Sequence, residues 1–186
     1  MLKPNLWTIL VLILAAAATR LAPHWWNLTA VGAVCLFGGC YFQRKWAAFL
    51  VPLAALAISD VVLQMFVYRG FGPNYFKYVC FAATVPLGYL LRGRTTLLPV
   101  ASSAVAATAL FFLLSNFQVW FSGHGRMYPQ TPAGLVACYV AALPFSLNML
   151  YGNLLFSGLL FGGMEWAKAR QTALARRSPA GIPTAA

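Results

Sequence analysis

Six apolar stretches, separated by short polar or basic segments, make up most of this chain. They cover residues 6–21, 29–42, 47–67, 75–91, 97–117 and 133–164. A helix needs roughly 20 apolar residues to cross the hydrocarbon core of a bilayer. The pattern therefore predicts an all-α polytopic membrane helix bundle of about six transmembrane helices, forming one domain over residues 1–167.

Two of these stretches depart from the length of a simple crossing. Residues 29–42 are short for a full span. Residues 133–164 are long enough for a surface helix, a kink at Pro144 where the ring removes a backbone hydrogen bond, and a span from about Phe145. We nevertheless expect six crossings.

Composition narrows the class of protein further. The chain is 61% hydrophobic and only 8% charged, whereas about a quarter of the residues of soluble domains are charged. The 13 basic residues, against two acidic ones, lie mostly between the apolar stretches, where they set membrane topology. The lipid bilayer is thus the expected partner, and nucleic acid is not.

The distribution of lysine and arginine predicts the orientation. With six spans, the N-terminus, the second and fourth connections and the C-terminal tail share one side, which carries nine basic residues against four on the other side. Positive charge favours the cytoplasmic side, so both termini are expected in the cytoplasm of a bacterium, with the spans in its inner membrane. Arg20 stands where a signal peptide would have a small-residue cleavage site, so we interpret the first stretch as a retained span. The basic tail at residues 168–186 is expected to be disordered.

Asp60 is the only aspartate in the chain, and it lies inside an apolar stretch where a charge is costly. At 1.5 Å per residue, Arg20 lies about 21 Å along the first span and Asp60 about 20 Å along the third, measured from the same face. The two side chains can therefore meet, and an arginine partner would keep the carboxylate ionised. Asp60 is either half of a structural ion pair or part of a site for a ligand or ion.

The three outer connections are rich in aromatic and polar residues, unlike the short basic ones on the inner side. We expect them to converge over an outward-facing pocket, in which an aromatic lid covers a polar floor of Arg20 and Asp60. The predicted lid residues are Trp26, Trp120 and Tyr128, and the predicted hydrogen-bonding residues are Asn27, Asn116, Asn148 and Asn153. The alternatives are an interfacial belt for the aromatic residues and hydrogen bonds between helices for the asparagines.

No catalytic, metal or cofactor motif is found in the sequence, so we expect neither an enzyme nor a bound cofactor. The four cysteines lie in apolar stretches without a C-x-x-C pair and are interpreted as buried hydrophobic residues. Glu165 and Lys168 are interpreted as a surface pair. Small residues at four-residue spacing, as in Gly158 and Gly162, predict helix packing inside the bundle or a docking face for another membrane subunit.

Several segments resemble a family of uncharacterised small bacterial integral membrane proteins. They are RLAPHWWNLTAVGA from Arg20, LFGG from Leu36, ISD ending at Asp60, YPQT from Tyr128, LPF from Leu143, and Gly152-Asn153. That family is similar in layout to the S components of energy-coupling-factor vitamin transporters, which have six spans, cytoplasmic termini and a pocket closed by outer loops.

The resemblance implies a protein that binds a small solute from the outside and passes it inward, driven by a membrane subunit with an ATPase. Where S components carry A-x-x-x-A in the first span, this chain has Ala15 and Thr19, and Asn153 stands where relatives have an acid. The competing hypothesis is a membrane scaffold or assembly protein that transports nothing. Asp60→Asn should abolish solute binding in the first case and change only stability or partner capture in the second.

Overall fold

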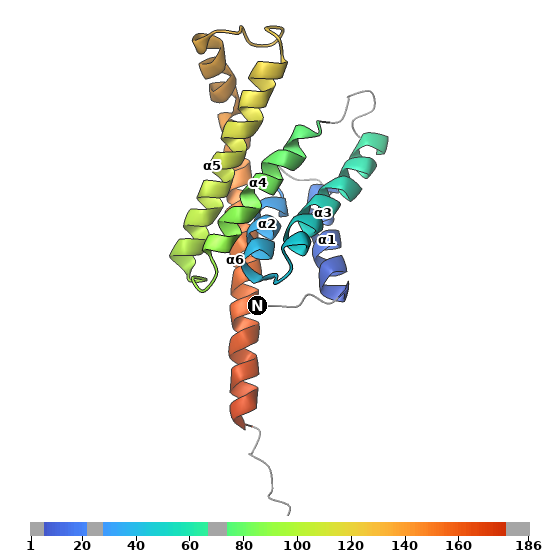
Figure 1. The fold of residues 1–186 in the computed structure, drawn as a ribbon, viewed down its shortest axis with the longest axis vertical. Helices are drawn as coiled ribbons and strands as arrows, with labels where there is room; N and C mark the ends of the chain where they lie inside the picture. The colour runs from blue at the N-terminus through green and yellow to red at the C-terminus, as the bar shows by residue number, and fades with distance from the viewer. Residues whose placement is uncertain (1–5, 22–27, 67–73, 178–186) are drawn as a thin grey trace, which may run out of the picture.

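The computed structural model describes residues 6–21, 28–66 and 74–177, which form six helices (Figure 1). The helices are α1 (Leu6–Leu21), α2 (Val31–Tyr41), α3 (Lys45–Phe66), α4 (Phe76–Leu90), α5 (Leu97–Ser122) and α6 (Pro132–Arg177). The all-α class and the six helical segments expected from the sequence are confirmed.

The last two helices are longer than the apolar pattern predicts. α5 continues to Ser122, and α6 runs without interruption from Pro132 to Arg177, with Pro144 inside it. The expectation that the tail is disordered from residue 168 is wrong as far as Arg177. Apart from Thr172, this segment is built from Ala, Lys, Arg, Gln and Leu, which are strong helix formers and extend α6 beyond its apolar part.

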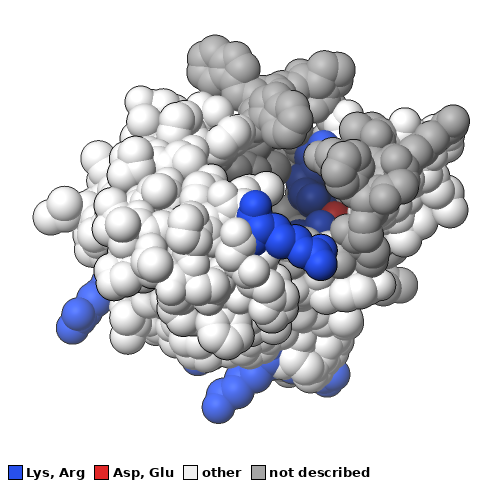
Figure 2. Space-filling model, turned by 90° about the horizontal axis from the view of Figure 1, so that it is seen from above, with Lys and Arg blue, Asp and Glu red and all other residues white. Residues whose placement is uncertain are grey.

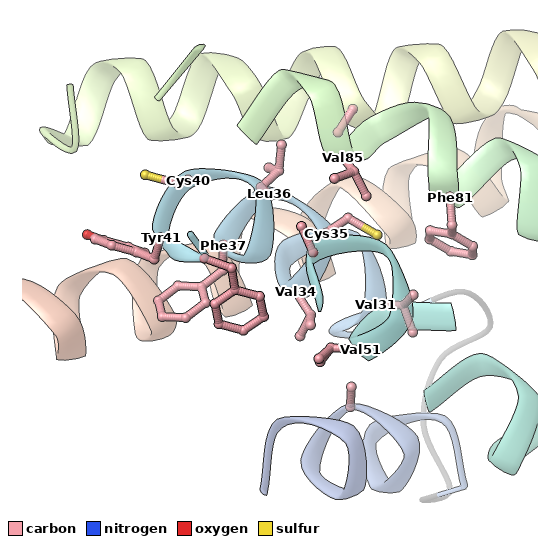
Figure 3. Close-up of a cluster of buried hydrophobic side chains, with 14 of the residues drawn as sticks. Val31, Val34, Cys35, Leu36, Phe37, Cys40, Tyr41, Val51, Phe81 and Val85 are labelled. Atoms are coloured by element: carbon pink, nitrogen blue, oxygen red, sulfur yellow. The ribbon is translucent and has the colours of Figure 1, made fainter. Parts of the chain in front are cut away.

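α2 is the central helix of the bundle. Every one of its residues from Val31 to Tyr41 is buried, and it packs against all five other helices. Its side chains radiate in several directions, with Val34 and Leu36 among those drawn in Figure 3. Eleven residues rise only about 16 Å, so α2 alone does not cross a bilayer. Its neighbours surround it, so it stays short without exposing backbone groups to lipid.

Three helices, α3, α5 and α6, are long and apolar enough to span a membrane, whereas α2, α4 and the described apolar part of α1 are shorter. The outside of the bundle is correspondingly apolar. Large exposed hydrophobic side chains include those of Trp7, Phe66, Leu97, Leu98, Met127 and Leu159. Exposed apolar surface on this scale indicates contact with lipid or another apolar partner.

Successive helices run in alternating directions (Figure 1). One end of the bundle, here called the Asp60 end, carries the C-termini of α1, α3 and α5 and the connection between α5 and α6. The opposite Glu165 end carries the α2–α3 and α4–α5 connections and the lower part of α6. This is the grouping on which the predicted orientation depends, while the cytoplasmic assignment itself stays a prediction.

The glycine pair on α6 does not pack inside the bundle. A Cβ atom added to Gly158 or Gly162 would meet no atom of the described structure within 4 Å, and the same holds for Gly163. The expectation of internal packing is therefore wrong for this pair. These glycines leave an open strip on the outer surface of α6.

Candidate functional site

Asp60 is held by three side chains at the Asp60 end. Nη1 of Arg20 lies 2.8 Å from Oδ1 of Asp60, and Nζ of Lys77 lies 2.8 Å from Oδ2. The hydroxyl of Tyr78 donates a hydrogen bond of 2.7 Å to Oδ2. The predicted pairing of Arg20 with Asp60 is confirmed.

Three helices position this cluster. Arg20 comes from the last turn of α1, Asp60 from the C-terminal half of α3, and Lys77 and Tyr78 from the first turn of α4. Arg20 is fixed further by hydrogen bonds to Oγ of Ser59 and, at 3.2 Å, to the carbonyl oxygen of Leu56. The guanidinium thus ties α1 to one turn of α3.

Sequence reasoning missed Lys77 and Tyr78 as partners of Asp60. From the sequence, Lys77 is only one of the four basic residues expected on the outer side. The position of Lys77 in the chain could have indicated this contact, because α4 begins at the same end of the bundle at which Asp60 lies on α3. A lysine there can reach inward along its flexible stem while its charge stays near the end of the bundle.

The cluster is partly shielded from solvent. The side-chain exposure is 12% for Asp60, 14% for Arg20 and 24% for Lys77. Electrostatic interactions are stronger there than on an open surface, because less water screens them. Two cations therefore share a single carboxylate that is partly shielded from solvent.

A cavity of about 90 Å³ opens beside this cluster. Its lining residues are Arg20, Thr29, Lys77, Phe81, Phe111 and Met149. Figure 2, which looks down on this end of the molecule, shows basic and acidic atoms inside a hollow. The described lining of the cavity thus combines two cationic side chains, one hydroxyl group and three apolar side chains.

A second cavity of about 170 Å³ lies between α5 and α6. Its lining residues are Phe111, Phe112, Ser115, Asn116, Ala142, Phe145, Ser146 and Met149. Phe111 and Met149 line both cavities, so the two spaces are neighbours separated by these two side chains. A ligand anchored at Arg20 or Lys77 could extend toward α5 and α6.

The structure disperses the predicted asparagines. Asn116 lines the second cavity, but its side-chain amide donates to the carbonyl oxygen of Phe112 on its own helix at 2.8 Å. Asn148 is half-buried on α6 and lines neither cavity. Asn153 is 1% exposed and donates to Oγ1 of Thr108 on α5 at 2.9 Å, as the alternative of hydrogen bonding between helices predicts.

Two of the predicted lid residues lie in the α5–α6 hairpin, away from both cavities. The indole N–H of Trp120 donates to the carbonyl oxygen of Pro129 at 2.9 Å, and its own carbonyl accepts from Gln130 at 2.6 Å. Trp120 therefore fastens the hairpin, and Tyr128 lies half-buried in its connection. Trp26 and Asn27 lie outside the described residues, so the proposed lid stays a prediction.

The second acidic residue, Glu165, lies at the opposite end. Its Oε1 is 2.7 Å from Nζ of Lys168 and also accepts hydrogen bonds from Tyr41 at 2.8 Å and Thr95 at 3.0 Å. The predicted pair with Lys168 is present. Glu165 is more than a surface charge, however, because it joins α6 to α2 and to the α4–α5 connection.

The cysteines behave as buried hydrophobic residues, as expected. Cys35, Cys40, Cys80 and Cys138 are all buried and free. Among the residues that the structure describes, no three His, Cys, Asp or Glu side chains gather closely enough to hold a metal ion. The chemistry of the described site therefore rests on the charges and hydrogen bonds around Asp60.

The fold and the apolar exterior define an all-helical protein with three helices long and apolar enough to span a membrane and a charged cluster beside a cavity at one end. The chain belongs to a family of unknown function, DUF6580, whose profile matches residues 1–176. No curated protein matches the chain, and no solved structure does.

Proposed function

We propose that this protein binds a small solute at the Asp60 end and passes it across the membrane, in the manner of an S component. The observation that carries the proposal is the cavity beside Asp60, because a costly charge cluster in a membrane protein coincides there with a space that a ligand could fill. The cavity lies on the side that the distribution of basic residues assigns to the exterior.

Transport against a gradient requires an energy source. The sequence has no nucleotide-binding motif, and Asp60 is bound by two cations that favour its ionised form. A carboxylate held in this way is poorly suited to pick up and release protons. A partner membrane subunit with an ATPase is therefore the proposed source of energy.

The location follows from the same reasoning. The bundle is proposed to lie in a bacterial inner membrane, with both termini and the Glu165 end facing the cytoplasm. Solute would enter from the opposite side, past the α5–α6 hairpin.

Native mass spectrometry of protein gently extracted from its own membrane tests the proposal. The expected result is a defined non-lipid molecule bound to the wild-type protein and absent from Asp60→Asn. The matched control is Glu165→Gln. It neutralises the second of the two acidic side chains of the chain, which lies at the opposite end of the bundle, so this variant should still bind the ligand. Retention of the molecule by Asp60→Asn would place binding elsewhere.

A scaffold or assembly role is the second candidate, and the open glycine strip of α6 favours it. Gly158, Gly162 and Gly163 would allow a partner helix to approach closely, as small residues do in membrane helix pairs. In the same experiment, a stoichiometric protein partner with only lipid bound would support this role over solute binding. Substitution of Gly158 and Gly162 by isoleucine should then release the partner.

A further inference from the structure

We propose that the solute bound at the Asp60 end is a small organic anion, with a carboxylate or phosphate group joined to a short apolar body. This inference rests on the proposed solute-binding function and specifies the chemistry of that site. It follows from the charge of the cluster, from the residues that line the first cavity and from the volume of the second cavity.

The charge of the cluster is unbalanced. Arg20 and Lys77 each contact Asp60 at 2.8 Å, and Tyr78 adds a neutral hydroxyl, so the three charged groups sum to one positive charge. An uncompensated charge is costly where it is partly shielded from water. A bound anion would remove this cost.

No other acidic side chain of this protein can supply that anion. The chain has two acidic residues, and the second, Glu165, lies at the opposite end in contact with Lys168, Tyr41 and Thr95. A full balancing charge at the Asp60 end would therefore have to come from another molecule.

The cations, not the carboxylate, form the wall of the cavity. Arg20 and Lys77 are among the described residues that line the 90 Å³ space, whereas Asp60 is not. A ligand in this space thus meets two positive groups whose side chains are positioned by their contacts with Asp60, so loss of Asp60 should release both cations from the cavity wall and weaken binding. An anionic ligand is attracted by this arrangement, and a cationic one is repelled.

The apolar lining residues predict the apolar body. Phe111 and Met149 line the first cavity and also line the 170 Å³ cavity between α5 and α6. A dry cavity of about 150 Å³ is large enough to bind benzene in another protein. The second cavity therefore has room for one small ring or a short chain attached to an anionic group in the first.

Equilibrium dialysis of the whole protein in neutral phosphatidylcholine nanodiscs tests this inference. The probes are a mixture of small carboxylic acids, including benzoate and hexanoate, with the amide and the amine of each, together with inorganic phosphate and phenyl phosphate. Bound compounds are quantified by mass spectrometry. We expect at least one organic anion to be retained about ten- to a hundredfold better than its neutral counterpart, since a hydrogen bond to a charged group contributes that much.

Two lysine variants link the selectivity to the site. Lys77→Met should weaken retention of the anion about ten- to a hundredfold, and Lys77→Arg, which keeps the charge, should restore most of it. The matched control, Lys168→Met, removes a cation that is already paired with Glu165 and should leave retention unchanged. The size-exclusion elution volume and the melting temperature of each variant, compared with those of the wild type, show whether the variant is folded.

The outcomes separate this inference from the proposed function. Selective retention of amides or amines would overturn the anionic ligand while leaving solute binding in place. Retention of none of the probes, with neither a non-lipid molecule nor a lipid bound in native mass spectrometry, would overturn both. An anionic phospholipid seen by native mass spectrometry and lost in Lys77→Met would confirm the anionic chemistry, assign it to a lipid headgroup and remove the case for a free solute.

Discussion

Gly39 of α2 and Gly88 of α4 face each other where these two helices come closest. A Cβ atom added to Gly88 would lie 2.9 Å from the Cα atom of Gly39 and would overlap the carbonyl oxygen of Leu36. A Cβ atom added to Gly39 would overlap the carbonyl oxygen of Val85 in the same way. The central helix α2 therefore approaches α4 through backbone rather than through side chains.

Gly88→Ala is expected to destabilise the protein. The clash is with backbone atoms, which cannot move aside as a flexible side chain can, so we expect a loss of about 1–3 kcal/mol, the usual cost of overpacking. Melting temperature in detergent, followed by size-exclusion chromatography, measures it. The control is Gly158→Ala, where the added Cβ would meet no described atom within 4 Å. Equal melting temperatures for the two variants would contradict this account of the α2–α4 contact.

Gly32 and Asn153 form a second close contact, between α2 and α6. The three atoms nearest to a Cβ added at Gly32 are all in the side chain of Asn153, with Cγ at 2.9 Å. Gly32→Ala should therefore be destabilising in the wild type but nearly neutral in the Asn153→Ala background. A double-mutant cycle of melting experiments should give a coupling free energy of about 0.5–3 kcal/mol. Additive effects would show that Asn153 is not what excludes a side chain at position 32.

Much of the helical layout could be predicted from the sequence because lipid imposes a strong apolar pattern. α1 begins and ends where the first apolar stretch does, at Leu6 and Leu21. Pairing of Arg20 with Asp60 was also predictable, since depth along two helices depends only on the rise per residue. Asp60 was the one carboxylate inside a predicted span, which made it the natural partner.

The arrangement of helices around the bundle could not be predicted in this way. Whether Lys77 or Asn148 faces Asp60 depends on helix rotation and on which helices are neighbours, and packing sets both. Asn153 faces Thr108 on α5, and Trp120 faces its own hairpin, for the same reason. The sequence alone predicts both Asn153 and Trp120 around one pocket, because it does not show which way either side chain faces.

At the Glu165 end, two partners of one carboxylate should differ in their contribution to stability. Lys168 is 48% exposed, and an exposed ion pair contributes about 0–1 kcal/mol, so Lys168→Met should change the unfolding free energy little. Tyr41 is 5% exposed and donates to the same oxygen, so Tyr41→Phe should cost about 1 kcal/mol. Melting temperatures of the two variants provide the comparison. A larger loss for Lys168→Met would mean that the pair, not the buried hydroxyl, fixes Glu165.

The predicted orientation can be tested by introducing one exposed cysteine at a time and labelling it. The four native cysteines should not interfere, because all of them are buried. Met127 is 73% exposed in the α5–α6 connection, and Thr96 is exposed in the α4–α5 connection at the other end. In intact cells, a membrane-impermeant maleimide should label Met127→Cys and spare Thr96→Cys, while both should react after lysis. The reverse pattern would place the Asp60 end, and with it the proposed solute entrance, in the cytoplasm.

The charge cluster itself makes the last prediction, which concerns the protein without ligand. Asp60→Asn would leave Arg20 and Lys77 facing each other without a carboxylate, so we expect a loss of about 1–3 kcal/mol, the cost of leaving a buried polar group unsatisfied. Lys77→Met should cost less, since the Arg20–Asp60 pair it leaves behind is neutral. Adding Lys77→Met to Asp60→Asn should then recover part of the lost stability by removing one of the two repelling cations. Melting temperatures of the two single variants and the double variant, in neutral lipid nanodiscs, measure all three effects. A double variant no more stable than Asp60→Asn would show that repulsion between these cations is small, and that the cluster tolerates its surplus charge without a bound anion.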